Sequence, residues 1–269
     1  MQSNHFQKWS RLGLGTGRLA SIGRGTSSQQ VHNLLSSMID CGITTIDTAD
    51  SYTSGSCERI LGTALQGRRE SFVIVTKAGY RYGDLPWPFL ALNPLIKKAH
   101  QKLSTGKCHA ADYLIHSLNR SLQRLKLDHV DAFLLHDPPL AAVECQAVQA
   151  SLQALQKTGK TIHLGVSSDD LHVLTAAINA GFFSVIQTPA NPSAMNRLSP
   201  IWNLAEQNGI HLMANHVFFS GNTSGCQPTP GESLHESLLK HACRAMEQGT
   251  ILVGTRSPMH LRECAEWAR

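Results

Sequence analysis

Several features that would assign this sequence to a well-defined class of protein are missing. Its seven cysteines are odd in number and never form a CxxC pair, so a disulfide framework is not indicated. No stretch reaches the roughly 18 consecutive apolar residues that a membrane-spanning helix needs. The first residues, MQSNHFQKWS, lack the apolar centre of a signal peptide. We therefore expect free thiols, no membrane partner and a cytoplasmic location.

Basic runs and metal-binding spacings are absent as well. The formal net charge is +5 and the pI is about 8.9, but Lys and Arg are scattered and no basic run is interleaved with aromatic residues. We therefore expect no nucleic-acid partner, and a small anionic ligand suits this mild charge better. The fourteen histidines include no HExxH motif and no paired Cys/His spacing, so we expect no metal site of the zinc-enzyme type.

The sequence does contain a regular alternation of short apolar runs and amphipathic stretches. The eight apolar runs lie at 11–16, 44–50, 72–79, 130–137, 161–168, 183–189, 210–217 and 250–255. Helical spacing between them is clearest at Val31, Leu34, Leu35, Met38 and Ile39, and at Leu114, Leu118, Leu122 and Leu125. Such an order predicts buried parallel strands joined by helices. Eight alternations favour a closed (β/α)8 TIM barrel, with one domain over residues 1–269, and an open α/β sheet is the alternative.

Polar residues follow several of these runs, at the end where barrels of this type carry their active sites. Taken singly, each has an ordinary explanation: a tyrosine on the rim, a solvated lysine or a hydrogen-bonded core histidine. Adjacent strand ends would nevertheless bring them together at one place. The residues are Asp47 and Tyr52 after the second run, Lys77, His136, Ser167 and Ser168 at the ends of the next three, and Gln187 in the sixth.

Six stretches carry a resemblance to a known family. They are IDTADSY, VIVTKAG, SLNRSLQRLKLDHVDAFLLHD, GKTIHLGVSS, VIQTPANP and ILVGTRSPMHLRE. In this order, over nearly the whole chain, they resemble the successive signatures of the aldo-keto reductases. The resemblance implies a barrel enzyme that reduces a small carbonyl substrate, an aldehyde or ketone, with NADPH.

The resemblance also implies a catalytic tetrad of Asp47, Tyr52, Lys77 and His136. The chemistry is reasonable for these residue types. A phenol with an ordinary pKa near ~10 needs a neighbouring cation to act as an acid at neutral pH, and Lys77 is that cation. Asp47 would keep Lys77 charged, and His136 would donate a hydrogen bond to the substrate oxygen.

Two stretches of the sequence can be compared with known ways of binding a cofactor phosphate. The stretch GLGTG (13–17) is a poor dinucleotide fingerprint, because its spacing is GxGxG and the next helix is expected only near Ser27. Ser257 and Pro258 instead predict the cap and first residue of a helix, whose free amides suit a phosphate. The resemblance implies that Thr255, Arg256 and His260 hold a 2′-phosphate there. It further implies cofactor contacts from Gly15, Thr16, Asp47, Ser167, Ser168, Gln187, Asn215, Phe218, Gly254 and Cys264.

Three features have weaker interpretations. We expect Asp50 to be a turn-capping or rim residue. The long insert at 80–108 either walls the substrate pocket or packs on the barrel, through Tyr80, Tyr82, Trp87 and Phe89. The last helical pattern reaches Arg269, so we expect an open substrate pocket.

Two other functions stay open at this point. A Schiff-base lyase could use Lys77 as an amine nucleophile, although its proposed partner Asp47 would oppose the deprotonation that this needs. A cofactor-binding sensor of the same fold is the other alternative, since NHVFFSG (215–221) departs from the usual tyrosine that stacks on the nicotinamide.

Overall fold

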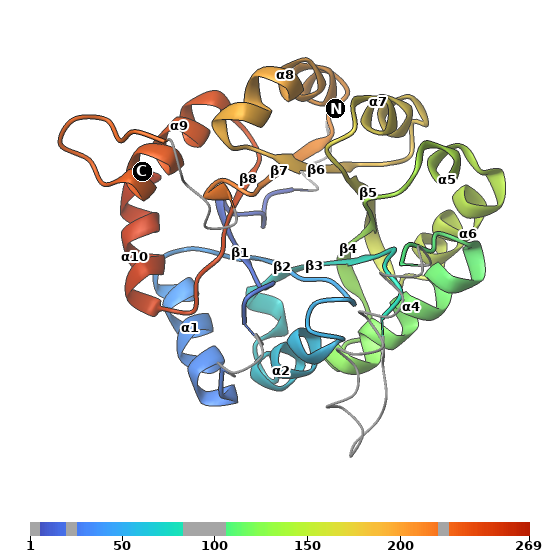
Figure 1. Cartoon of the computed structure of the whole chain (residues 1–269). Helices are drawn as coiled ribbons and strands as arrows, with labels where there is room; N and C mark the ends of the chain where they lie inside the picture. The colour runs from blue at the N-terminus through green and yellow to red at the C-terminus, as the bar shows by residue number, and fades with distance from the viewer. Residues whose placement is uncertain (1–5, 20–25, 83–105, 220–225) are drawn as a thin grey trace.

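The computed structural model describes residues 6–19, 26–82, 106–219 and 226–269. Eight parallel strands pair in sequence order and close through β8 and β1, and helices surround them (Figure 1). The predicted (β/α)8 barrel is therefore confirmed. The strands are β1 Leu12–Gly15, β2 Thr45–Asp47, β3 Val73–Ala78, β4 Val130–His136, β5 Thr161–Ser167, β6 Val185–Pro189, β7 His211–Asn215 and β8 Thr250–Val253.

The helices of the described ranges lie between and after these strands. Each apolar run of the sequence contains one strand, usually trimmed by one or more residues at its ends. The helices are α1 Ser28–Asp40, α2 Ser56–Ala64, η1 Arg69–Ser71, α4 Ala111–Leu125, α5 Leu140–Glu144, α6 Gln146–Lys157, α7 Leu171–Asn179, α8 Pro192–Gln207, α9 Leu234–Ala245 and α10 Pro258–Trp267.

Helix α1 shows how local chemistry fixes an element. Ser27 caps it and exchanges side-chain hydrogen bonds with Gln30, a capping box that satisfies two amides at the helix start. The predicted apolar face is buried apart from its last member, Ile39, which is 47% exposed. That part of the expectation was wrong, because Ile39 lies one residue beyond Met38 and therefore about 100° around the helix.

The inside of the barrel is filled by every second residue of the strands. One apolar cluster there contains Val73, Val75, Ala132, Leu134, Val185, Met213 and Leu252. Side chains alternate between the two faces of a strand, so Lys77 continues the row of Val73 and Val75, and His136 that of Ala132 and Leu134. The alternation of side chains thus places apolar residues in the middle of the barrel. At the carboxyl end of the same rows it turns polar residues inward.

Aromatic side chains close the amino end of the barrel. The Phe6 ring stacks between His163 and His211, at centroid distances of 4.5 and 4.7 Å. Trp9 lies 4.5 Å from His211, and both Phe6 and Trp9 pack against the interior cluster. This end of the barrel is a packed core rather than an open channel.

Two expectations from composition concern the chain as a whole. None of the seven cysteines, all in described ranges, forms a disulfide, which agrees with the expected free thiols. None of the helices in the described ranges has the length and apolar character to cross a membrane.

Candidate active site

A buried ion pair lies at the carboxyl end of the barrel. The Lys77 ammonium donates to Asp47 Oδ1 at 2.5 Å, and the two residues are only 1% and 3% exposed. Gln187 Nε2 donates to the same oxygen at 2.8 Å, and its own Oε1 accepts from Ser167 Oγ at 2.7 Å. Residues from β2, β3, β5 and β6 therefore meet in one hydrogen-bonded group across the barrel.

The charges of this group are fixed by burial and by neighbours. Burial lowers the pKa of Lys77, but Asp47 and then Tyr52 more than offset it, so that pKa lies above its ordinary value. Burial raises the pKa of the Tyr52 phenol, and Lys77 opposes this only in part. At neutral pH Lys77 is therefore a cation and Tyr52 a protonated phenol.

Tyr52 and His136 flank the ion pair. The Lys77 ammonium lies 5.3 Å from the centre of the Tyr52 ring. The Tyr52 and His136 rings are 6.0 Å apart and nearly perpendicular, at 83°. The structure thus brings all four residues of the predicted tetrad together: an acid, a cation, a carboxylate and an imidazole around one point.

Residues expected to contact a nicotinamide lie around the same end of the barrel. Thr16 is fully buried, and its backbone amide and hydroxyl both contact the Asp47 carbonyl, at 2.9 and 3.0 Å. Asn215 Nδ2 donates to Gln187 Oε1 at 3.2 Å, while Asn215 Oδ1 is buried and has no hydrogen-bond partner in the described part of the chain. The buried acceptor is available for an amide donor such as a carboxamide.

Four further predicted cofactor residues occupy different environments. Gly15 lies at the end of β1, beside Asp47 of β2. Ser168 is 7% exposed and its hydroxyl accepts from the Asp170 amide at 3.1 Å. Phe218 packs on the core and lies edge-on to His235 at 5.1 Å. Cys264 is 5% exposed inside the core, where burial raises the pKa of its thiol to about 12.

The segment before α10 forms the predicted helix start. Ser257 caps the helix by accepting from the His260 amide at 3.3 Å, and Pro258 is its first residue. Thr255 Oγ1 accepts from the Ser257 amide at 3.1 Å. Arg256 is partly exposed, while Gly254 and His260 are exposed. A helix amino terminus with nearby cationic and hydroxyl side chains is open to a phosphate here.

The stretch GLGTG has a packing role instead. A methyl group added at Gly13 would lie 2.8 Å from the Leu252 side chain and 3.0 Å from that of Thr250. This close approach to β8 requires a glycine, and the helix that follows starts only at Ser28. The poor match to a dinucleotide fingerprint agrees with this geometry.

Asp50 is not the rim residue that we expected. It is fully buried, and its amide donates to the Lys77 carbonyl at 3.0 Å, which draws the chain after β2 into the protein. Burial, together with Glu58, raises the pKa of the Asp50 carboxyl well above its ordinary range. The expectation was wrong because it assumed that a carboxylate after a short strand faces water.

The base of the long insert lies beside His136, a contact that the sequence did not indicate. Tyr80 pairs with Lys107 across a short antiparallel bridge, and its ring lies 4.8 Å from that of His136. Residues Trp87 and Phe89 lie outside the described residues, and Tyr82 packs over Arg124, 5.7 Å from its guanidinium carbon. Of the two aromatic residues of the insert that the structure describes, Tyr80 lies beside the predicted tetrad and Tyr82 packs on Arg124.

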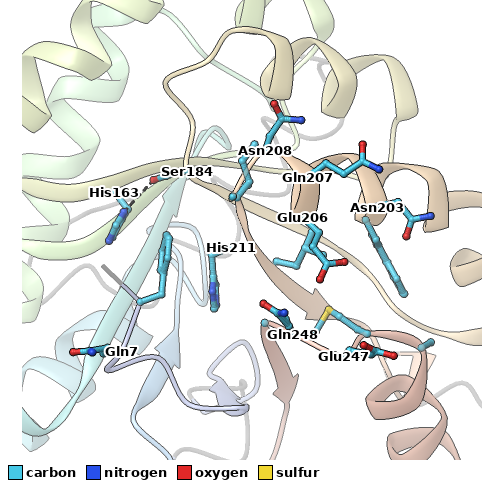
Figure 2. A pocket seen from close by; sticks show the side chains of 18 of the residues that line it. Gln7, His163, Ser184, Asn203, Glu206, Gln207, Asn208, His211, Glu247 and Gln248 are labelled. Atoms are coloured by element: carbon cyan, nitrogen blue, oxygen red, sulfur yellow. Dashed lines mark hydrogen bonds between the residues drawn. The ribbon is translucent and has the colours of Figure 1, made fainter. Parts of the chain in front are cut away.

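A large cavity lies elsewhere in the described part of the chain. It measures about 1280 Å³ and opens at the amino end of the barrel, between α8, β7 and the chain before β8 (Figure 2). Amide and carboxylate side chains such as Asn203, Glu206 and Gln248 line it, with His163 and His211 at one side. None of the predicted catalytic or cofactor residues contributes to its wall, so we do not place the active site there.

Comparison with known proteins gives a match over most of the chain. The family model described as "Aldo/keto reductase family" matches residues 11–231. The uncharacterized oxidoreductase YqkF of Bacillus subtilis is 31% identical over 199 residues, which cover 73% of this chain and 58% of that protein. This chain matches only about half of the length of YqkF and of two other Bacillus subtilis relatives.

Solved structures agree with the fold. An aldo-keto reductase from Bacillus halodurans, in its holo form, superposes with a TM-score of 0.76 at 20% identity, covering 97% of this chain and 87% of that one. An aldo-keto reductase from Klebsiella pneumoniae in complex with NADPH gives a TM-score of 0.72 at 24% identity, with 97% and 86% covered. The family model spans well over half of the residues, from β1 to beyond β7, and the chain belongs to the aldo/keto reductase family.

Proposed function

We propose that the protein is an NADPH-dependent reductase that converts an aldehyde or ketone to an alcohol. The observation that carries the proposal is the Lys77–Asp47 pair beneath Tyr52, with His136 at its side. A protonated phenol next to a buried cation is suited to deliver a proton to an oxygen that becomes negative.

In the proposed reaction, each residue of the tetrad has a separate task. The bound nicotinamide supplies the hydride that is added to the carbonyl carbon. Tyr52 transfers its phenolic proton to the carbonyl oxygen, and Lys77 stabilises the phenolate that remains. Asp47 keeps Lys77 protonated and fixed in place, and His136 donates a hydrogen bond that orients the carbonyl group.

The cofactor assignment rests on residues that fit its two ends. Asn215 offers a buried oxygen without a partner in the described residues, and Gln187 lies beside it, so the carboxamide of a nicotinamide would find an acceptor there. At the other end, Arg256 and Thr255 lie before the amino terminus of α10 and would hold a 2′-phosphate. The Klebsiella pneumoniae protein of similar fold was crystallised with NADPH, which supports this choice of cofactor. Cys264 is the weakest member of the proposed set, because it is buried in the core.

Among the alternatives, the lyase is disfavoured by one specific property. A Schiff base requires a neutral Lys77, whereas the Asp47 carboxylate at 2.5 Å holds the pKa of Lys77 above its ordinary value. We therefore assign Lys77 the role of a fixed cation rather than a nucleophile.

The deciding experiment is an activity assay with the purified protein, NADPH and a panel of aldehydes and ketones, following the loss of reduced-nicotinamide absorbance. Turnover of at least one carbonyl compound is the expected result. Tight NADPH binding without turnover on any of them would instead support a cofactor sensor. A borohydride-trapped substrate on Lys77 would support the lyase.

A further inference from the structure

The His136 imidazole lies near two tyrosine rings, each nearly perpendicular to it. The ring centres of Tyr52 and Tyr80 lie 6.0 and 4.8 Å from that of His136, at interplanar angles of 83° and 86°. Tyr52 belongs to the proposed tetrad, whereas Tyr80 has no part in the reaction described above. Since the Tyr80 ring is the closer of the two, any movement of that ring would change the room available to the imidazole.

The Tyr80 ring is itself fixed through the residue that follows His136. The Tyr80 hydroxyl donates to Asp137 Oδ2 at 2.7 Å, and the Lys107 ammonium forms an ion pair with the same oxygen. Lys107 also lies 5.6 Å from the centre of the Tyr80 ring. The three side chains thus form one closed group, which we call the Tyr80 clamp.

The backbone at Asp137 is adapted to this arrangement. Its φ is 52°, a left-handed conformation that residues other than glycine adopt at a cost, with aspartate and asparagine among the more tolerant. Its amide donates to the Ser167 carbonyl at 2.8 Å. This turn directs the Asp137 carboxylate toward Tyr80 and Lys107 directly after the strand that carries His136.

The clamp also lies at the base of the long insert. Tyr80 and Lys107 face each other across the antiparallel bridge, and the amides of Arg81 and Cys108 donate to the carbonyls of Gly106 and Gly79 at 2.7 and 2.8 Å. The Tyr113 hydroxyl donates to the Tyr80 carbonyl at 2.9 Å. The backbone around Tyr80 is therefore held by both ends of the insert, while its side chain is held by Asp137 and Lys107.

We propose that Tyr80, Asp137 and Lys107 are positioning residues that hold the His136 imidazole in the orientation needed to bind the substrate carbonyl. The clamp acts through His136 and does not touch the reacting atoms. The inference rests on the proposed reductase function, in which His136 contacts the substrate. Loosening the clamp should reduce turnover without weakening cofactor binding, because Tyr80, Asp137 and Lys107 are not among the proposed cofactor contacts.

The matched test compares two tyrosines of the same segment. Tyr80→Phe removes the hydroxyl that reaches Asp137 but keeps the ring. Tyr113→Phe removes a hydroxyl that donates to the Tyr80 carbonyl and does not reach the clamp side chains. We expect Tyr80→Phe to lower kcat about five- to tenfold, the size of one lost hydrogen bond, with unchanged NADPH affinity. Tyr113→Phe should keep parental kcat.

A second readout does not depend on activity. In protein with isotope-labelled histidine, the ring signal of His136 is assigned by its loss in His136→Asn. We expect this signal to shift and broaden in Tyr80→Phe and to stay at its parental position in Tyr113→Phe. If Tyr80→Phe leaves both kcat and the His136 signal unchanged, or if Tyr113→Phe has the same effects, the clamp does not position His136. The two proposals can fail separately. If the parent protein shows no reductase activity but its His136 signal moves in Tyr80→Phe and not in Tyr113→Phe, the proposed function is contradicted and the positioning of His136 by the clamp is supported.

Discussion

Lys77 is the residue on which most of the proposed chemistry depends. Its side chain ends in a positively charged ammonium, and the residue is 1% exposed. An isolated buried ammonium would lose its proton or destabilise the fold. The Asp47 carboxylate at 2.5 Å prevents this. A buried pair of this kind is weak evidence for stability, so we interpret it as a device that keeps a cation next to Tyr52.

The first prediction concerns this pair. Asp47→Asn should lower NADPH-dependent turnover at least tenfold, because Lys77 loses the carboxylate that raises its pKa and becomes a weaker cation for the Tyr52 phenolate. The measurement is kcat for the parent and the variant at neutral pH, with circular dichroism as a check that the fold is intact. Borohydride treatment should trap no adduct in either protein, and an adduct at Lys77 of the parent would disprove the mechanism.

The second prediction concerns the proton donor. Tyr52→Phe removes the phenol but keeps the ring that packs beside His136, so reduction should fall by roughly a hundredfold or more, the usual range for a lost general acid. NADPH binding, followed by the change in protein fluorescence, should stay within about twofold of the parent. Parental turnover in this variant would mean that another group supplies the proton.

The third prediction tests the choice of cofactor. Arg256→Ala should weaken NADPH binding by about 1.5–3 kcal/mol, the contribution of a hydrogen bond to a charged group, and leave NADH binding nearly unchanged. Titration of both cofactors into the parent and the variant measures this. Arg262→Ala, an exposed change within α10, is the control. Equal affinity of the parent for NADPH and NADH would remove the basis for the 2′-phosphate site.

At the scale of elements, α2 and α4 are packed unusually close behind the active site. A methyl group added at Gly62 of α2 would lie 2.3 Å from the carbonyl oxygen of Arg124. The Arg124 Nε donates to Glu58 Oε2 at 2.7 Å, and Thr76 Oγ1 donates to Glu58 Oε1 at 2.6 Å. These contacts connect two helices to β3, the strand that carries Lys77.

The fourth prediction follows from this connection. Arg124→Met should lower the free energy of unfolding by about 3–5 kcal/mol, because it leaves the Glu58 carboxylate buried without its cation. Asp50, a second buried acid nearby, increases that penalty. Urea unfolding of the parent and the variant measures the loss. Arg262→Met breaks an exposed pair with Asp40 and a hydrogen bond to Ser37 Oγ at 3.0 Å, and should cost about 2 kcal/mol at most. Similar losses in both variants would contradict the role of burial.

For the whole molecule, the two ends of the barrel have different chemistry. The carboxyl end carries the charged and hydrogen-bonded group around Lys77, while the amino end is closed by Phe6, Trp9 and two histidines. His211 Nε2 lies 3.0 Å from Thr250 Oγ1. Burial, with a smaller effect of His163, lowers the pKa of His211 to about 3. Protonation of the buried His211 therefore lowers the stability of the fold.

The fifth prediction is a dependence of stability on pH. Below its ordinary pKa of 6.5 the unfolded chain binds a proton at His211, whereas the folded chain does not until about pH 3. Stability is thus complete above pH 6.5 and decreases as the pH falls, by up to about 2 kcal/mol at pH 5 for this residue. The difference in unfolding free energy between the parent and His211→Gln should shrink by that amount between pH 7.5 and pH 5. Thr250→Val, which keeps the histidine, should retain the parental pH slope, and a parental slope in His211→Gln would exclude His211 as its source.

The sequence by itself determined the barrel and the polar residues that lie at its carboxyl end. Alternating apolar runs and helical spacing are local properties, and they specified eight strands whose inward faces end in Asp47, Lys77, His136 and Gln187. The cap at Ser257 was equally readable, because a helix start depends on neighbouring residues. The roles proposed for these residues came from their resemblance to a family and stay predictions until they are measured.

Only the tertiary structure decided which side chains touch. The bond from Gln187 to Asp47 joins residues 140 positions apart across the barrel, and Tyr80 reaches Asp137 over 57 positions. Asp50 gave no sign of burial in the sequence, since its surroundings come from α2 and α4 rather than from its neighbours in the chain. Such contacts depend on strand register, barrel closure and helix packing, which bring together residues that no local pattern relates.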